Sequence, residues 1–313
     1  MANDGAIRRV GFLGVGSMGG PMAQNAALKG YEVHAYDPRP EALAALAEDG
    51  IGGCASAAEV ARRTELVIAM PYDIVQVEQA VSGPAGLLEG WDGPGLLAVM
   101  STVGPTGVRD LAGRLAERGH RLVDAPVSGG HHGAAAGTLT LMVGAAPADL
   151  ERCRPVFETF AANVVHVGTE PGVGQAAKLI NNQLVFVHHV AMAEALVLAA
   201  RMGLDLRTVY DIVTTSFGNS VVFNHRVPAV LDRSFRSGGA LNILVKDARL
   251  VLESAQATET PMFATAAAAQ VFELARAMGL GDEDDVAVVK AFERILGQEL
   301  GEMGPRGENS AGS

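Results

Sequence analysis

The sequence contains little cysteine and more acidic than basic side chains. Only two of its 313 residues are cysteines, Cys54 and Cys153, which lie far apart and without metal-ligand spacing. We therefore expect two buried thiols in a reducing compartment, with no disulfide framework and no metal site. The formal net charge of −11 disfavours nucleic acid and anionic lipid as partners, and no Lys/Arg-rich run offsets it.

Long charge-free apolar runs are also missing. None reaches the ~20 residues that a membrane span needs, and residues 1–9 have no apolar segment of the kind found in secretory signals. Hydrophobic residues nevertheless make up 49% of the chain, enough for sizeable cores, and the length favours two domains. The sequence predicts a cytoplasmic globular protein that binds neither nucleic acid nor membranes.

In the first half of the chain, short apolar strands alternate with helical segments such as residues 18–29. Strands are predicted at residues 9–15, 31–36, 66–70, 96–100, 121–124, 138–143 and 164–167. This alternation is typical of an α/β domain whose mostly parallel sheet is covered by helices on both faces, as in the Rossmann fold.

Beyond Gly174 the pattern becomes helical. Residues 175–202 predict one apolar helix of roughly 40 Å, which we expect to be buried between domains or subunits. Further helices are predicted at residues 206–215, 242–258, 261–278 and 285–300. The predicted organisation is a dinucleotide-binding domain at residues 1–169, an all-helical C-terminal domain at residues 170–300 for substrate binding and oligomerisation, and a disordered tail at residues 301–313.

The first motif is a glycine-rich loop that follows the first predicted strand and opens a helix. It reads Gly14-Val15-Gly16-Ser17-Met18-Gly19, and Asp37 follows at the end of the next strand, as a dinucleotide-binding site requires. Gly14 permits a tight turn, Gly16 permits close approach of the backbone to a pyrophosphate, and Gly19 permits packing of the helix, whose N-terminus favours anions. A flexible turn without a ligand is the alternative.

Two residues bear on which dinucleotide binds. The Asp37 carboxylate would accept hydrogen bonds from the adenosine ribose and repel a 2′-phosphate, which favours NAD. Arg39, two residues further on, carries a guanidinium of the kind that pairs with such a phosphate. The sequence therefore predicts NAD as the cofactor, with NADP as the alternative.

A second segment places small residues at a strand end. It reads Asp124-Ala125-Pro126-Val127-Ser128-Gly129-Gly130. Such a backbone can approach a ligand closely and offer N–H groups and a hydroxyl to a carboxylate. A tight strand-to-helix connection without a ligand explains the segment equally well.

The third segment, GVGQAAKLINN, places an amine and amides on the long predicted helix. Lys178 and Asn182 are four residues apart and so are neighbours on one helix face. This arrangement predicts a proton donor beside a hydrogen-bonding clamp. By itself, a lysine in a helix is more often a solvated surface charge.

Together these segments, and Lys246-Asp247 in LVKDARLVL, resemble in order and spacing the β-hydroxyacid dehydrogenase family, over about residues 10–296. The resemblance implies a Rossmann domain, a helical domain, homodimers or homotetramers, and hydride transfer between a nicotinamide cofactor and a small 3-hydroxy acid or its semialdehyde. It implies that Lys178 is the general acid/base and that Asn182 holds the substrate. The residues that it implies beside them are Ser128, Gly129 and Gly130 for the substrate carboxylate, and Met70, Pro71, Ser101, Thr102 and Lys246 beside the cofactor.

The chain departs from the family pattern in two places. His131-His132 follow the small-residue segment, where an imidazole either binds an extra polar group of the substrate or is simply exposed. Residues 235–240, including Arg236, are expected to form a longer and more flexible segment than family members often have. These departures leave the choice of hydroxy acid open.

The mechanism and its rivals follow from the same residues. Free lysine has a pKa of about 10.4, so Lys178 suits reduction as an acid, and oxidation should improve at alkaline pH. Two alternatives are an NADP-dependent imine reductase and a non-catalytic dinucleotide-binding module. Both are expected to lack a lysine at this position.

Overall fold

The computed structural model describes residues 6–235 and 239–303. The chain divides into two compact units, residues 1–179 and 180–313. The predicted domain boundary at residues 169/170 stays a prediction. Of the predicted tail, residues 301 and 302 belong to a short 3-10 turn, Leu300–Glu302, and Met303 is buried. The remainder of the tail, and Arg236 in the atypical segment, lie outside the described residues.

Nine strands of the described chain form one sheet in the first unit, in the order β3-β2-β1-β4-β5-β6-β8-β7, with β9 beside β8. Their bounds are β1 Arg9–Leu13, β2 Glu32–Tyr36, β3 Gly52–Gly53, β4 Leu66–Ala69, β5 Leu96–Val99, β6 Arg121–Asp124, β7 Val127–Ser128, β8 Leu139–Gly144 and β9 Ala161–Gly168. Strands β1 to β6 pair in parallel, whereas β8 is antiparallel to β6 and β7. The predicted mostly parallel sheet is confirmed. Strands β3 and β7 were not predicted because two residues carry no periodic signal.

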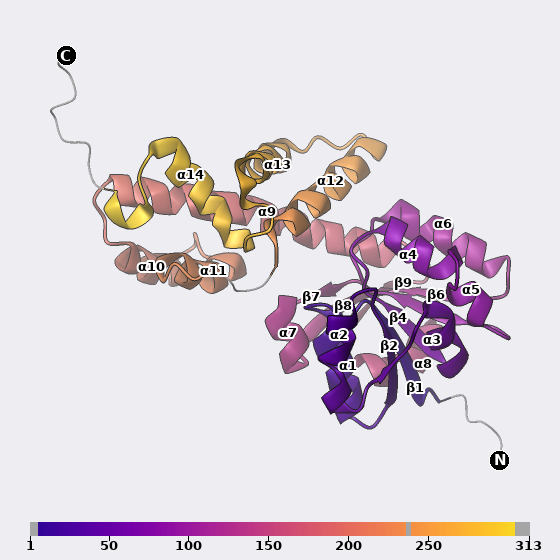
Figure 1. The fold of residues 1–313 in the computed structure, drawn as a ribbon. Helices are drawn as coiled ribbons and strands as arrows, with labels where there is room; N and C mark the ends of the chain where they lie inside the picture. Colours follow the sequence, from indigo (N-terminus) through magenta and orange to yellow (C-terminus); the bar gives the residue numbers. More distant parts are fainter. Residues whose placement is uncertain (1–5, 236–238, 304–313) are drawn as a thin grey trace, which may run out of the picture. The chain divides into compact units, whose positions relative to one another are not determined.

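Helices cover both faces of this sheet (Figure 1). Their bounds are α1 Gly19–Leu28, α2 Pro40–Ala44, α3 Ala57–Arg63, α4 Ile74–Ser82, α5 Leu87–Gly90, α6 Pro105–Ala116, α7 Gly130–Ala136 and α8 Pro147–Phe157. Successive residues of a strand point to opposite faces, so Leu66 and Ile68 join the core beneath α1 and α8, while Val67 and Ala69 join the core beneath α3, α4 and α6. Two hydrophobic cores result, one on each face.

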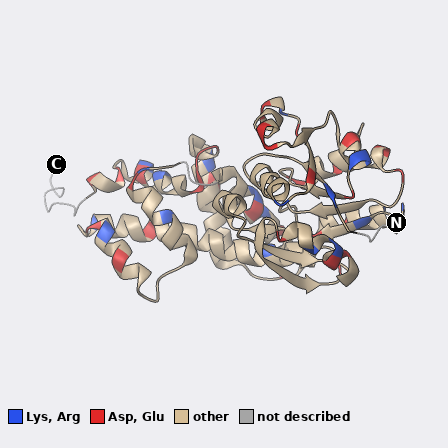
Figure 2. Ribbon diagram, turned by 90° about the horizontal axis from the view of Figure 1, so that it is seen from below, with Lys and Arg blue, Asp and Glu red and all other residues tan. Residues whose placement is uncertain are grey.

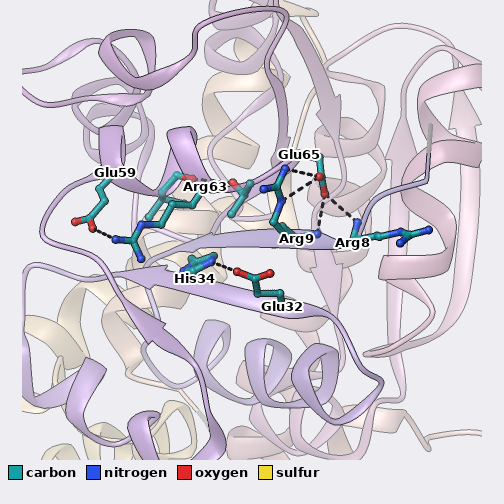
Figure 3. Close-up of polar contacts among 9 residues, drawn as sticks. Arg8, Arg9, Glu32, His34, Glu59, Arg63 and Glu65 are labelled. Atoms are coloured by element: carbon teal, nitrogen blue, oxygen red, sulfur yellow. Dashed lines mark hydrogen bonds and ion pairs between the residues drawn. The ribbon is translucent and has the colours of Figure 1, made fainter. Parts of the chain in front are cut away.

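The two ends of the strands differ in chemistry. At the amino end, Glu65 accepts hydrogen bonds from the backbone N–H groups of Arg8 and Arg9 (2.9 and 2.7 Å) and from the Arg9 guanidinium (Figure 3). These contacts tie the start of β1 to the start of β4. The opposite, carboxyl end is where the predicted cofactor loops leave the sheet. In an open parallel sheet, ligands bind at this end, where the strand order reverses, here between β1 and β4.

The second unit is helical in its described residues. The helices are α9 Val173–Arg201, which begins in the first unit, α10 Leu206–Thr214, α11 Val221–Leu231, α12 Leu241–Ala257, α13 Phe263–Ala275 and α14 Val288–Leu296. α11 was not predicted because Pro228 lies inside it and weakens the helical pattern. In the helix predicted at residues 261–278, α13 ends at Ala275 and is followed directly by a π-helical segment, Arg276–Leu280, in which Gly279 has a φ of 82°.

The 29-residue helix α9 is long and apolar enough to cross a membrane by length and composition. Half of its most apolar window is buried inside the protein, as in the core helix of a soluble protein. Figure 2 shows acidic and basic residues interspersed on the ribbon of both units. We therefore interpret α9 as a core helix.

Candidate active site

The glycine loop leaves the carboxyl end of β1 in the geometry that its sequence predicts. Gly14 has a φ of 82°, which favours glycine, and its N–H donates to the carbonyl of Tyr36 at 2.9 Å. A Cβ on Gly19 would lie 2.0 Å from the carbonyl oxygen of Gly14, so only glycine allows α1 to start this close to the turn. The first N–H groups of a helix have no intrahelical partner and favour phosphate. The loop therefore fits a dinucleotide.

Asp37 is buried directly after β2, and two neighbouring residues donate hydrogen bonds to it. It accepts hydrogen bonds from the N–H of Val15 (2.9 Å) and from Nε and Nη2 of Arg39 (both 2.9 Å). Burial raises the pKa of Asp37, but the bonds from Arg39 and Val15 outweigh it and leave the pKa below its usual value. Nη2 of Arg39 would lie 3.2 Å from a Cβ on Gly16. The cation therefore lies beside the glycine loop and offsets the charge that would repel a 2′-phosphate.

Two further loops lie at the carboxyl end of the sheet, after β4 and β5. A Cβ on Gly14 would lie 3.0 Å from the carbonyl of Met70 and 3.2 Å from the nitrogen of Pro71. Oγ of Ser101 donates to the carbonyl of Pro71 at 2.5 Å, and Thr102 follows, half-buried. The structure thus brings the glycine loop and both predicted nicotinamide-side loops together within the first unit.

The small-residue segment lies beside the glycine loop. Ser128 ends β7 and is half-buried, and Gly129 and Gly130 have φ values of 132° and 62°, which explains their identity. The exposed His131 has Nδ1 2.8 Å from the carbonyl of Ser17, so the segment is joined to the predicted phosphate loop. His132 is also exposed. His131 is thus exposed, as one of the two alternatives from the sequence expects, and its ring contacts the backbone of Ser17.

Lys178 lies on α9 within the first unit and is buried, with 9% of its surface exposed. A lysine ammonium is costly to bury unless it has partners or a function. The observed burial therefore argues against the solvated surface lysine that the helix pattern alone would allow.

Asn182, four residues further along α9, belongs to the second unit and is held by Asp247. Its Nδ2 donates to Asp247 Oδ2 at 2.8 Å, and its Oδ1 accepts from the side chain of Asn181 at 3.1 Å. Nζ of Lys246 lies 2.6 Å from the other carboxylate oxygen, Oδ1 of Asp247. One buried carboxylate therefore fixes both predicted ligand-binding side chains of this unit.

Sequence reasoning assigned no role to three buried polar residues of the site: Asp124, Gln175 and Asp247. Each lies inside one of the motifs named above, and Asp124 and Gln175 are polar residues among small or apolar neighbours. These patterns are the sequence signal that could have identified them.

The described residues contain no group of three or more His, Cys, Asp or Glu side chains that could hold a metal ion. Cys54 and Cys153 are both buried and unbridged. Burial raises the pKa of Cys153 to about 12, so this thiol is unreactive at neutral pH.

Two family models cover most of the chain. Residues 9–168 match the NAD-binding domain of 6-phosphogluconate dehydrogenase, and residues 172–292 match a model described as NAD-binding of NADP-dependent 3-hydroxyisobutyrate dehydrogenase. The predicted nicotinamide dinucleotide cofactor, NAD or NADP, is confirmed.

Individual proteins match over nearly their whole length. 2-(Hydroxymethyl)glutarate dehydrogenase of Eubacterium barkeri is 37% identical over 92% of this chain and 96% of its own. L-Threonate dehydrogenase of Cupriavidus necator is 38% identical over 92% and 97%. The crystal structure of 3-hydroxyisobutyrate dehydrogenase from Salmonella typhimurium is 35% identical, with a TM-score of 0.84 over 90% of this chain and 99% of that one. The predicted fold class, an N-terminal Rossmann-like domain followed by a helical region, is confirmed.

Proposed function

The chain belongs to the β-hydroxyacid dehydrogenase family, and from that premise we propose that it transfers a hydride between nicotinamide and a small 3-hydroxy acid or its semialdehyde. Membership makes it an NAD(P)-dependent oxidoreductase of small hydroxy acids, as predicted. The observation that carries the more specific proposal is the burial of Lys178 on a helix that also bears Asn182, one turn further along.

In this proposal Lys178 is the group that exchanges the proton. In the oxidation direction its amine accepts the hydroxyl proton of the substrate, and in the reduction direction its ammonium returns a proton to the carbonyl oxygen. The ammonium also attracts the substrate carboxylate, which matters in a chain of net charge −11. Oxidation should therefore be faster at alkaline pH, where more of the lysine is neutral.

The cofactor would be held by the loops of the first unit. Gly14 and Gly19 fit the turn and the close helix that a pyrophosphate requires. Val15, Gly16, Ser17 and Met18 supply the backbone between them. Asp37 and Arg39 would bind the adenosine ribose, and Met70, Pro71 and Thr102 would flank the nicotinamide. The resemblance to the family adds Lys246 to the cofactor-binding residues. When bound, the nicotinamide accepts or supplies the hydride.

The substrate carboxylate would be bound by Ser128, Gly129, Gly130 and Asn182. An asparagine amide carries two N–H donors, and Asp247 accepts one of them. Because Asp247 and Asn181 fix which way the amide faces, we propose that the second N–H donates to the substrate.

Replacing Asn182 with alanine should lower kcat/KM for hydroxy acids roughly 10- to 150-fold. This corresponds to the 1.5–3 kcal/mol of a hydrogen bond to a charged group. Because a methyl ester lacks the charge, the ester should be a poor wild-type substrate and only slightly worse with the variant. The measurement is kcat/KM for acid and ester with both proteins.

The matched control is Gln183→Ala, which removes the adjacent amide of α9, bonded to Oγ1 of Thr265 at 3.1 Å, and should leave kcat/KM unchanged. If wild-type protein treats acid and ester equally, no carboxylate site exists here.

Replacing Asp37 with alanine should shift cofactor preference toward NADP. The change removes the carboxylate that would bind the ribose hydroxyls. It also breaks the ion pair between Asp37 and Arg39, so that Arg39 becomes available to bind a 2′-phosphate. The measurement is the ratio of kcat/KM for NAD to that for NADP in both proteins. A wild-type enzyme that already prefers NADP would show that Arg39, not Asp37, decides the choice.

A panel of short 3-hydroxy acids, their semialdehydes and cyclic imines, assayed with NAD and NADP, tests the function itself. Turnover of imines alone would favour an imine reductase, and cofactor binding without any turnover would favour a non-catalytic module. We further propose that the protein is cytoplasmic and forms homodimers or homotetramers, which sedimentation equilibrium would measure.

A further inference from the structure

The side chain of Gln175 is a buried junction between three segments of the first unit. It is fully buried, and its Oε1 accepts hydrogen bonds from the N–H groups of Val103 (2.8 Å) and Gly104 (3.1 Å). Its Nε2 donates to the carbonyl of Ser101 (3.0 Å) and to Oδ1 of Asp124 (3.0 Å). One amide therefore joins the loop after β5, the end of β6 and the first turn of α9.

Asp124 completes the junction by capping α9 from a distant strand. Its Oδ2 accepts from the backbone N–H groups of Gly172 (2.8 Å) and Gln175 (3.0 Å), which lie at the start of the helix. These N–H groups have no partner within a helix and need one when buried. Burial raises the pKa of Asp124 to about 6, against the N–H donors of Gln175 and Gly172, which lower it.

The junction accepts the glutamine amide in one orientation only. If the amide were reversed, its N–H groups would face the N–H groups of Val103 and Gly104. Its oxygen would face the Ser101 carbonyl and the Asp124 carboxylate. Each reversed contact leaves a buried polar group unsatisfied, which is costly. The position of the loop relative to α9 is therefore fixed by the chemistry of the amide.

We propose that Gln175 and Asp124 are positioning residues that hold Lys178 at a fixed place relative to the loop of Ser101 and Thr102. Lys178 lies three residues after Gln175 on the same helix, so the junction fixes the turn that carries its side chain. Ser101 in turn bonds to Pro71, so the junction reaches both loops assigned to the nicotinamide side. The inference rests on the function proposed above.

The expected effect of breaking the junction is on turnover. A displacement of about 1 Å of a catalytic group can cost up to 10²-fold in rate. We therefore expect a loss of about 10- to 100-fold in kcat, with the affinity for AMP, which needs only the glycine loop and Asp37, unchanged. A residue that merely stabilised the fold would lower the unfolding midpoint without this selective loss of kcat.

The test is Gln175→Glu, which keeps the shape and the acceptor for Val103 and Gly104. The introduced carboxylate would face Asp124 and the Ser101 carbonyl, and two carboxylates this close share one proton. Protonated, the new side chain can again donate to Asp124. The ratio of variant to wild-type kcat should therefore be low at pH 9 and rise as the pH falls to 6.5. The guanidinium of Arg109 also lies beside the start of α9, with its Nε 2.8 Å from where a Cβ on Gly172 would be.

Two companion variants complete the test. Gln175→Met removes the hydrogen bonds without adding a charge, so its kcat should be low with a pH-independent ratio to wild type. Gln183→Ala, two turns further along α9, should match wild type in kcat and pH profile. A pH-independent ratio for Gln175→Glu, or wild-type kcat in Gln175→Met, would overturn the proposal. If Gln175→Met does not fold, Gln175→Glu at pH 6.5 and 9 provides the comparison.

Hydrogen exchange gives a readout that does not depend on activity. In both Gln175 variants the amides of residues 172–180 and 101–104 should exchange faster than in wild type, and in Gln183→Ala they should not. Unchanged protection in those segments would refute the positioning role proposed for Gln175. This outcome can be read even if the wild-type protein turns over no hydroxy acid. The proposed function is tested separately, by turnover in the wild-type protein.

Discussion

We expect turnover of hydroxy acids to fall at least about 10²-fold when Lys178 is replaced with alanine, the usual scale for removing a general acid/base. The reason is that Lys178 is the proton-transfer group in the proposed mechanism. Because the glycine loop and Asp37 are unchanged, the dissociation constant for NAD should stay near the wild-type value. Steady-state kcat and NAD binding by fluorescence titration measure the two quantities.

The control for this variant is Lys178→Arg, which keeps the positive charge but cannot act as a base near neutral pH. It should bind hydroxy acids and still fail to oxidise them. Near wild-type kcat in a correctly folded Lys178→Ala protein would exclude Lys178 as the acid/base.

Replacing Gly174 with alanine should destabilise the protein by about 2–4 kcal/mol, a large overpacking cost. A Cβ on Gly174 would lie 2.3 Å from the carbonyl oxygen of Met142 and 3.0 Å from that of Asp124. Both are backbone atoms and cannot rotate away, so the start of α9 must move. The midpoint of urea unfolding should fall, and kcat should fall with it because the Asp124 cap is displaced.

Gly113→Ala is the matched control. Gly113 is exposed inside α6, and nothing lies within 4 Å of a Cβ added there. Alanine is favoured over glycine in a helix interior by about 0.5–1 kcal/mol, so this variant should be slightly stabilised. If Gly174→Ala were equally well tolerated, the packing of α9 against β6 and β8 would not be what requires glycine at this position.

The fold could be predicted largely because its signals are local. Strands such as β4 are short apolar runs, and the glycine loop has a fixed spacing between a strand and a helix. α11 was not predicted because Pro228 interrupts the helical sequence pattern, although the helix continues on both sides of Pro228. The antiparallel pairing of β8 was missed as well, since strand direction depends on partners distant in the sequence.

The sequence could name the candidate site residues that belong to motifs, but not the residues that hold them in place. The side chain of Gln175 contacts Ser101, 74 residues away in sequence, and Asp124, 51 residues away. The sequence reports neither distance nor partner. Likewise, the ion pair between Asp37 and Arg39 depends on side-chain rotamers, so the spacing of the two residues in the sequence could not decide between NAD and NADP.

The place where the first unit ends has a consequence for recombining this protein with its relatives. The family models meet between residues 168 and 172, and a chimera joined there would take the helical half from one parent and the sheet from another. Gln175 and Lys178 would then come from the parent that did not supply Ser101, Val103 and Asp124. The first unit extends to residue 179, so a junction after Leu179 inherits the buried amide and its four partners from a single parent.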